Sequence, residues 1–393
     1  MAAGDTLFVP TYARANPPFV EGKGVYLYDS RGRAYLDFGS GIAVNALGHA
    51  HPQLVRTLRE QGARLLHASN LYYTRPQVDL ARLLIKRSFG DRVFLCNSGT
   101  EAVEAAIKFS RKWAAGVSSK KYHILSFEDG FHGRTYGALS ATAQKKFHAG
   151  FGPMMEGFHH APFNDIDAAR KVLDKHEFAA VLVEPLQGES GIRPADTKFL
   201  RFLRSHTRKH RVALVFDEIQ CGGGRTGTLW NYEQHGVVPD IMTLAKPIGG
   251  GLPLGAVVCT RKISRAISPG DHGTTFGGNP LACALGREVL RVVGRKPFLK
   301  DVTKKGEYLV SRLEALAASY PAIKEVRGAG LMVGVEMSRD PKAIVEACRT
   351  KGLLVIKAGH NTVRFMPPLI VRKAEIDRAV EVFEAVLKST RGA

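Results

Sequence analysis

Cysteine is scarce in this sequence, and no apolar run is long enough to cross a membrane. The five cysteines among the 393 residues are widely separated and lie mostly in apolar stretches: Cys96, Cys221, Cys259, Cys283 and Cys348. An odd number of dispersed thiols, without a C-x-x-C pair or a Cys/His cluster, predicts reduced and buried cysteines and implies no metal site. The longest apolar runs, 178–183 and 212–216, have the length of strands.

Targeting signals are also missing. The N-terminal sequence MAAGDTLFVP has neither a charged region followed by an apolar core nor an Arg-rich amphipathic stretch. We therefore expect a soluble protein with no membrane partner, located in a bacterial cytoplasm or, after removal of a leader, in a mitochondrial matrix. No internal repeat or low-complexity tract is present, and a composition of 45% hydrophobic and 23% charged residues is typical of globular enzymes.

Acidic residues are outnumbered, which leaves a formal net charge of +20. Such a charge raises nucleic acid as a partner, because clustered Lys and Arg neutralise phosphates. Basic residues are instead spread along the chain, with only short groups such as 208–211 and 304–305. We expect a solvated basic surface that attracts carboxylate substrates and phosphorylated cofactors, and no nucleic-acid partner.

The middle of the chain alternates short β-branched runs with helical patterns, which predicts an α/β fold with a mostly parallel central sheet. Six runs are expected to be strands: Val93–Cys96, His123–Phe127, Ala180–Val183, Ala213–Phe216, Ile241–Leu244 and Ala256–Cys259. Helical spacing of apolar residues predicts a helix over 100–114 between the first two. Because polar or glycine-rich loops follow these strands, we expect the loops to converge on one site at the carboxyl edge of the sheet.

The C-terminal part has a different pattern, with predicted helices at 303–319 and 375–388 and strands at 331–337, 353–356 and 362–365. This indicates a smaller α+β domain over residues 300–393, beside a large domain over 51–299. A hairpin within residues 24–38, turning at Ser30-Arg31-Gly32, belongs to an N-terminal segment (1–50) that we expect to pack with the small domain.

Three motifs carry candidate chemistry. Ser98, Gly99 and Thr100 lie between a strand and a helix, where free backbone N–H groups suit a phosphate, although a plain capping box is the commoner meaning of this pattern. Asp217 and Lys246 each end an apolar strand. Such a pair is often only a salt bridge, but an Asp can also keep a pyridinium nitrogen protonated while a Lys amine forms a Schiff base with an aldehyde.

The chain resembles the class III, fold type I aminotransferases that depend on pyridoxal 5'-phosphate, and within them the acetylornithine aminotransferase branch. Seven motifs in family order carry this resemblance over almost the whole length: Gly41–His49, Asn97–Ala102, Phe131–Arg134, Val183–Glu189, Phe216–Gln220, Leu244–Pro247 and Thr274–Pro280. The resemblance implies a fold type I transferase that acts as a homodimer.

The resemblance also implies roles for individual residues. Lys246 binds the cofactor covalently and transfers the proton, Asp217 pairs with the ring nitrogen, and Gln220 contacts the ring hydroxyl. Ser98, Gly99 and Thr100 hold the phosphate, Phe131 stacks on the ring, and Thr275 reaches the phosphate of the neighbouring subunit's cofactor. On the substrate side the resemblance implies Thr274, Arg364 as the fork for the α-carboxylate, Arg134 as a second anchor, and Glu189 as a switch that neutralises Arg364. A surface ion pair is the default reading for Arg134 and Glu189 alone.

The implied reaction is a ping-pong transfer of the terminal amine of N2-acetyl-L-ornithine to 2-oxoglutarate, as in arginine biosynthesis. An apolar Ile42, where ornithine aminotransferases carry a tyrosine in the same motif, favours an acylated donor. Succinyl-diaminopimelate, succinylornithine and free ornithine remain alternative donors, with 4-aminobutyrate further off. From other classes, a homologue without catalysis and a basic nucleic-acid-binding protein stay open.

Overall fold

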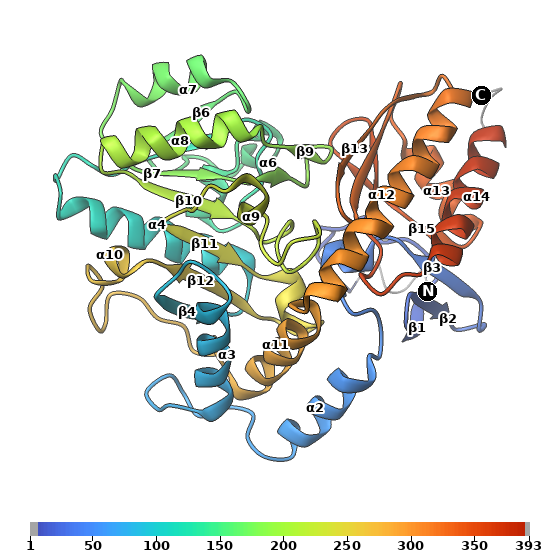
Figure 1. The fold of residues 1–393 in the computed structure, drawn as a ribbon, viewed down its shortest axis with the longest axis horizontal. Helices are drawn as coiled ribbons and strands as arrows, with labels where there is room; N and C mark the ends of the chain where they lie inside the picture. The colour runs from blue at the N-terminus through green and yellow to red at the C-terminus, as the bar shows by residue number, and fades with distance from the viewer. Residues whose placement is uncertain (1–6, 390–393) are drawn as a thin grey trace.

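The computed structural model describes residues 7–389, and the first six residues of the predicted N-terminal segment lie outside this range. The chain forms a larger part, built on a central sheet, and a smaller part that combines the N-terminal hairpin with the C-terminal elements (Figure 1). Within residues 7–389 no helix is both long and apolar enough to span a bilayer.

The central sheet has seven strands in the order β4-β12-β11-β10-β7-β5-β6. All six predicted strands are confirmed, and β6 is an addition: β4 Arg92–Cys96, β5 His123–Phe127, β6 Phe158–Ala161, β7 Phe178–Val183, β10 Ala213–Asp217, β11 Ile241–Leu244 and β12 Gly255–Cys259. The sequence of β6, FHHA, contains two histidines, and these hide the apolar pattern from sequence analysis.

The sheet is mostly parallel, as predicted, but β12 runs antiparallel to both of its neighbours. Only ten residues separate the end of β11 from the start of β12, and they hold a short 3-10 helix, η2 Lys246–Gly249. A parallel connection needs a crossover of a dozen or more residues, usually with a helix, so this short link returns the chain in the opposite direction.

Helices cover both faces of the sheet. The predicted helix is present as α4 Gly99–Ala115, whose buried Ala102, Val103 and Ala106 pack on one face with Ile124 and Val215. The neighbouring strand residues Leu125 and Phe216 face the other side, where α8 Thr197–Lys209 and α7 Ile166–Leu173 lie (Figure 1). This alternation follows from the two-residue period of a strand.

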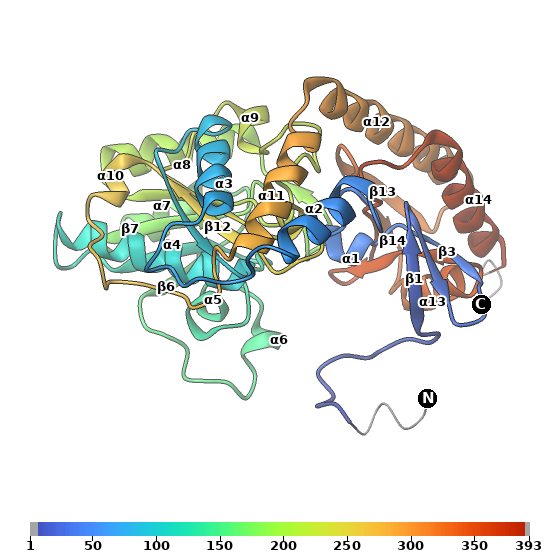
Figure 2. The same cartoon turned by 90° about the horizontal axis from the view of Figure 1, so that it is seen from below.

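The remaining helices surround this framework: α1 Ser40–Ala43, α2 Pro52–Gly62, α3 Arg75–Lys86, α5 Tyr136–Ala141, α6 Lys145–His148, α9 Tyr232–His235, α10 Arg261–Ser264 and α11 Pro280–Val293. Helix α2 packs against α11, and α11 packs against α3 (Figure 2).

The smaller part contains two four-stranded sheets. One consists of β13 Ile323–Ala329, β14 Met332–Met337, β17 Thr362–Phe365 and β16 Ile356–Ala358, and its helices are α12 Lys296–Ser319, α13 Lys342–Thr350 and α14 Lys373–Ser389. The other consists of β1 Phe19–Lys23, β2 Tyr26–Asp29, β3 Ala34–Asp37 and β15 Leu353–Leu354. Because β15 pairs with β3, the N-terminal hairpin and the C-terminal segment share one sheet (Figure 2).

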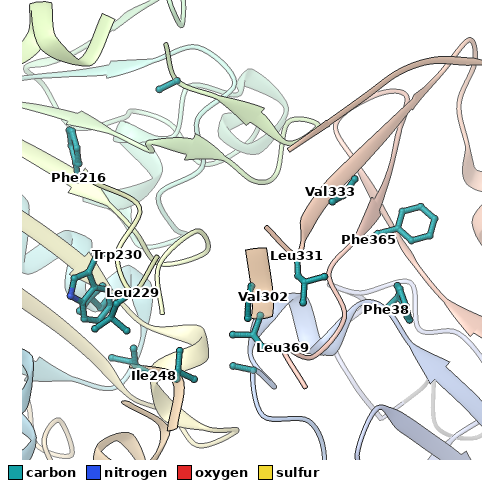
Figure 3. Close-up of a cluster of buried hydrophobic side chains, with 14 of the residues drawn as sticks. Phe38, Phe216, Leu229, Trp230, Ile248, Val302, Leu331, Val333, Phe365 and Leu369 are labelled. Carbon is teal, nitrogen blue, oxygen red and sulfur yellow. The ribbon is translucent and has the colours of Figure 1, made fainter. Parts of the chain in front are cut away.

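One hydrophobic core runs through both parts (Figure 3). Phe216 and Trp230 belong to the larger part, whereas Phe38 and Phe365 belong to the smaller part and meet edge to face at 6.2 Å. Helix α12 begins at Lys296, four residues before the boundary predicted from the sequence. The continuous core holds the carboxyl ends of the central strands close to β17, which carries Arg364.

Candidate active site

Loops that follow five strands of the central sheet converge on a cavity of about 460 Å³, as predicted. Nine of the candidate site residues line it: Ser98, Gly99, Thr100, Phe131, Arg134, Glu189, Asp217, Gln220 and Lys246. Residues that sequence analysis did not assign also line it, among them Val44, His132, Glu184, Ile219 and 251–254.

Lys246 brings an amine to the cavity. It follows Ala245, the first residue after β11. Its backbone has a left-handed φ of 41°, which L residues rarely adopt and which is concentrated at functional sites. Burial lowers the pKa of Lys246, Arg364 lowers it further, and the negative charge of Glu189 offsets this only in part. A larger fraction of the amine is therefore neutral and able to attack an electrophile.

Asp217 is fixed in the cavity by three hydrogen bonds. His132 Nδ1 lies 2.7 Å from one carboxylate oxygen, while the Thr243 hydroxyl and the Ile219 N–H each donate to the other oxygen at 3.1 Å. Burial by itself lowers the pKa of His132, but the hydrogen bond and the charge of Asp217 outweigh it, so the pKa is raised. These hydrogen bonds hold the Asp217 carboxylate in one orientation in the wall of the cavity.

His132 and Glu184 are site residues that sequence analysis left without a role. Glu184 directly follows β7 and accepts hydrogen bonds from the N–H groups of Phe131 (2.8 Å) and Gly188 (3.2 Å). Burial raises the pKa of Glu184 to about 7. His132 counteracts this rise only in part, and the like charge of Asp217 adds to it. Two features of the sequence could have indicated these residues: His132 lies within the Phe131–Arg134 motif, and Glu184 directly follows a predicted strand.

The start of α4 offers an anion site. Ser98 is the N-cap residue and its side chain accepts from the Glu101 N–H, which is one half of a capping box, while the Glu101 carboxylate accepts from the Asn97 N–H. Among residues 7–389, no hydrogen bond is found to the backbone N–H groups of Gly99 and Thr100, both of which line the cavity. These free donors at the positive end of a 17-residue helix suit a phosphate.

Phe131 and Arg134, which lie in the loop after β5, form part of the cavity wall. The Arg134 guanidinium lies 5.6 Å from the centre of the Phe131 ring and 3.9 Å from that of Phe147. Arg134 is exposed, whereas Phe131 is half-buried and can offer an aromatic face to a planar ligand.

Arg364 reaches the site from β17 of the smaller part. Its Nη1 donates to the Glu189 carboxylate (2.9 Å), the Gln220 side-chain oxygen (2.9 Å) and the Gly188 carbonyl (3.0 Å). Gln220 also donates to Glu189 at 3.2 Å. Burial by itself raises the pKa of Glu189, but Arg364, followed by Lys246, outweighs it and brings that pKa to about 2.

Four sequence-based candidates are not among the cavity-lining residues: Arg364, which is held by the lining residues Glu189 and Gln220, and Thr274, Thr275 and Ile42. Thr274 accepts a hydrogen bond from the Asn97 side chain at 3.1 Å, and the exposed Thr275 lines a separate depression with His67. Ile42 is 40% exposed and is not among the cavity-lining residues, so its expected influence on the donor has no support within one chain.

The model of the family described as aminotransferase class-III matches residues 11–387. The chain belongs to the class-III aminotransferases. It shares the pyridoxal-phosphate dependence of this family, and the cavity fits that cofactor because a nucleophilic amine, an oriented carboxylate and unpaired N–H donors all face it.

Individual members of the class-III aminotransferases are similar over nearly the full length. The acetylornithine aminotransferase of Caldanaerobacter subterraneus subsp. tengcongensis is 48% identical over 383 residues, 97% of each chain. That of Methanocaldococcus jannaschii is 46% identical over 95% of this chain and 94% of its own.

Solved structures of class-III aminotransferases share the fold type I architecture of this chain. The N-acetylornithine aminotransferase of Stenotrophomonas maltophilia K279a has a TM-score of 0.85 and 35% identity over 99% of both chains. The ornithine aminotransferase of Toxoplasma gondii ME49 has a TM-score of 0.95 and 31% identity over 100% of this chain and 95% of its own.

Proposed function

We propose that this aminotransferase transfers the terminal amino group of N2-acetyl-L-ornithine to 2-oxoglutarate. The products are N-acetylglutamate 5-semialdehyde and L-glutamate, a step of arginine biosynthesis. Acetylornithine aminotransferases at 45–48% identity over nearly the whole chain support this donor. The observation that carries the proposal is the buried Arg364–Glu189 pair beside Lys246, because it can serve both substrates in turn.

Pyridoxal phosphate supplies an aldehyde that bonds to amines and a ring that withdraws electrons from the adjacent carbon. The chain's residues would hold it at three points. Gly99 and Thr100, with Ser98 beside them, would bind the phosphate at the start of α4, Phe131 would lie against the ring, and Asp217 would face the ring nitrogen. His132 and Thr243 keep the Asp217 carboxylate in one orientation.

Lys246 would hold and move the proton. Because its pKa is lowered, the amine can accept a proton from the carbon that carries the donor's terminal nitrogen and release it again nearby. Lys246 stands at the start of η2, after Ala245, which follows β11, and lines the cavity.

The two substrates would differ at Arg364. 2-Oxoglutarate brings a carboxylate next to its reacting carbon, which the guanidinium of Arg364 can bind with two hydrogen bonds. The donor's terminal amine has no carboxylate beside it, so Glu189 would keep Arg364 neutralised during that half-reaction. The exposed Arg134 at the rim would bind the donor's α-carboxylate, with Thr274 as a further contact.

We also propose a homodimer in which Thr275 reaches the neighbouring subunit's cofactor phosphate. Leu71, Tyr73 and Phe276 are 86%, 93% and 64% exposed, which is unusual for large apolar side chains gathered in one region. The two segments are joined, because the Asn70 side chain donates to the carbonyls of Thr274 (3.0 Å) and Gly277 (2.8 Å). The compartment stays a prediction, bacterial cytoplasm or mitochondrial matrix.

Steady-state kinetics with a panel of donors test the proposal. N2-acetyl-L-ornithine, succinylornithine, succinyl-diaminopimelate and free ornithine are each assayed with 2-oxoglutarate, and kcat/KM is compared. We expect the highest value for N2-acetyl-L-ornithine. A higher kcat/KM for free ornithine would assign the chain to the activity for which its Toxoplasma gondii structural neighbour is named.

A further inference from the structure

Three histidines that the proposed reaction does not use meet at the amino-terminal edge of the central sheet. His123 is the first residue of β5, His159 is the second residue of β6, and His176 lies in the segment between α7 and β7. Their ring nitrogens lie within 4.8 Å of one another. No other group of three such His, Cys, Asp or Glu side chains is present among residues 7–389.

The backbone explains why the three rings meet. His159 pairs with Leu125 in the parallel β5–β6 ladder, and Leu125 is two residues after His123, so both histidines project from the same face of the sheet. His176 is two residues before Phe178, which pairs with His123 in the β5–β7 ladder. Strands β5, β6 and β7 are neighbours beneath α7 and α8 (Figure 1).

The three imidazole rings are packed closely together, and one of them, His176, is exposed to solvent. The ring centres lie 4.9 Å apart for His123 and His159, 4.7 Å for His123 and His176, and 4.2 Å for His159 and His176. Phe178 meets all three rings, with centre distances between 5.5 and 6.1 Å. His123 and His159 are half-buried, whereas His176 is exposed.

We propose that His123, His159 and His176 form a binding site for one zinc ion per chain. Three imidazoles with a fourth, solvent-accessible position are a coordination set that zinc adopts in proteins. Tetrahedral bonds of about 2.0 Å place nitrogens about 3.3 Å apart, so side-chain movements of about 1 Å bring all three into range.

The present contact between His123 and His159 supports this site. His123 Nδ1 and His159 Nε2 are 2.9 Å apart, which requires that one nitrogen donates a proton and the other offers a lone pair. The ring nitrogen that accepts this proton already presents its lone pair toward the neighbouring ring.

The site is separate from the catalytic cavity. In the parallel strands β5, β6 and β7 the three histidines lie at the amino ends, whereas the residues of the cavity follow the carboxyl ends. An ion there would join two strands and the segment before a third, and it would stabilise the folded chain because the three ligands are brought together only by the fold.

Zinc titration of the holoenzyme tests the proposal. After chelator treatment and removal of free cofactor, isothermal calorimetry with ZnCl₂ should give one saturable site per chain, and MgCl₂ should give none because Mg²⁺ prefers oxygen ligands. Zinc should also raise the melting temperature saturably, and EDTA should reverse the rise. X-ray absorption should show nitrogen ligands at about 2.0 Å.

The variants His159→Gln and His176→Ala should each weaken zinc binding at least tenfold. His176 is exposed and lies before β7, so its replacement provides the second variant if His159→Gln fails to fold. His206→Ala is the matched control, because His206 and His210 also stack, at 4.3 Å, without a third ligand among the described residues. Absence of a saturable zinc site in the wild type, or equal loss in the His206 variant, overturns the proposal.

Discussion

Replacement of Glu189 by alanine should slow one half of the reaction much more than the other. In the structure the Arg364 guanidinium is buried, and Glu189 is its only carboxylate partner among the described residues. Without Glu189, the donor half-reaction would proceed beside an uncompensated positive charge. 2-Oxoglutarate brings its own carboxylate to Arg364, so the second half-reaction should be spared.

The size of the effect follows from the electrostatics of the pair. The fall of the Glu189 pKa from 4.5 to about 2 corresponds to about 3 kcal/mol of stabilisation of its charged form. Since 28% of the Glu189 side chain is exposed, solvent screening reduces this to about 2 kcal/mol. We therefore expect kcat/KM of the donor half-reaction to fall about 30-fold, and that of the 2-oxoglutarate half-reaction to change less than about threefold.

Single-turnover spectroscopy separates the two halves. The enzyme loaded with pyridoxal phosphate is mixed with N2-acetyl-L-ornithine alone, and the pyridoxamine form is mixed with 2-oxoglutarate alone, while the cofactor's absorbance is followed. Glu189→Gln should show most of the same effect, because glutamine keeps the shape of the side chain but removes its charge.

Asp167→Ala is the control, since it removes an ion pair with Arg170 in which both side chains are more than half exposed. Neither half-reaction should change in this variant. Equal slowing of both half-reactions by Glu189→Ala would refute the reasoning and leave the Arg364–Glu189 pair with a structural role only.

Three further predictions concern other parts of the molecule. Lys246→Ala should lower turnover at least about 10²–10⁴-fold while circular dichroism stays unchanged, and retention of a tenth of the activity would contradict its role. Thr275→Ala should weaken cofactor binding in equilibrium dialysis, and light scattering should show a dimer at assay concentration, whereas a fully active monomer would exclude the shared site. Asp240→Asn should lower the free energy of unfolding by about 3 kcal/mol, because it leaves the buried Arg204 without its 2.9 Å partner. Burial raises the pKa of Asp240, but Arg204 outweighs it and lowers the pKa below 3.8, so this contribution is present above pH 3.8 and the deficit should shrink as denaturation is measured at lower pH.

Local sequence was sufficient to predict the strands and the loops that follow them, and its motifs were sufficient to indicate the family. Lys246 and Asp217 could be found because each stands directly at the end of an apolar run, and strand ends meet at one edge of a parallel sheet. The motifs added Ser98, Gly99, Thr100, Phe131 and Gln220, and the structure brings these five residues to the same cavity as Lys246 and Asp217.

Only the tertiary structure decided which side chains touch. His132 binds Asp217 across 85 positions, and no local spacing reveals that pair. The family resemblance implied that Glu189 acts on Arg364, and the structure supplies the geometry of this contact across 175 positions. The direction of β12 depended on the absence of a crossover helix, and β6 was hidden by its two histidines.

The histidine cluster shows most clearly what the sequence determines and what only the tertiary structure determines. No short spacing in the sequence suggested a metal site, and none was predicted. His123, His159 and His176 stand on three separate segments, and they meet because β5 lies between β6 and β7 in the sheet. Strand order is set by packing between distant segments, so the sequence determined which imidazoles the chain carries, and the fold determined that they share one place.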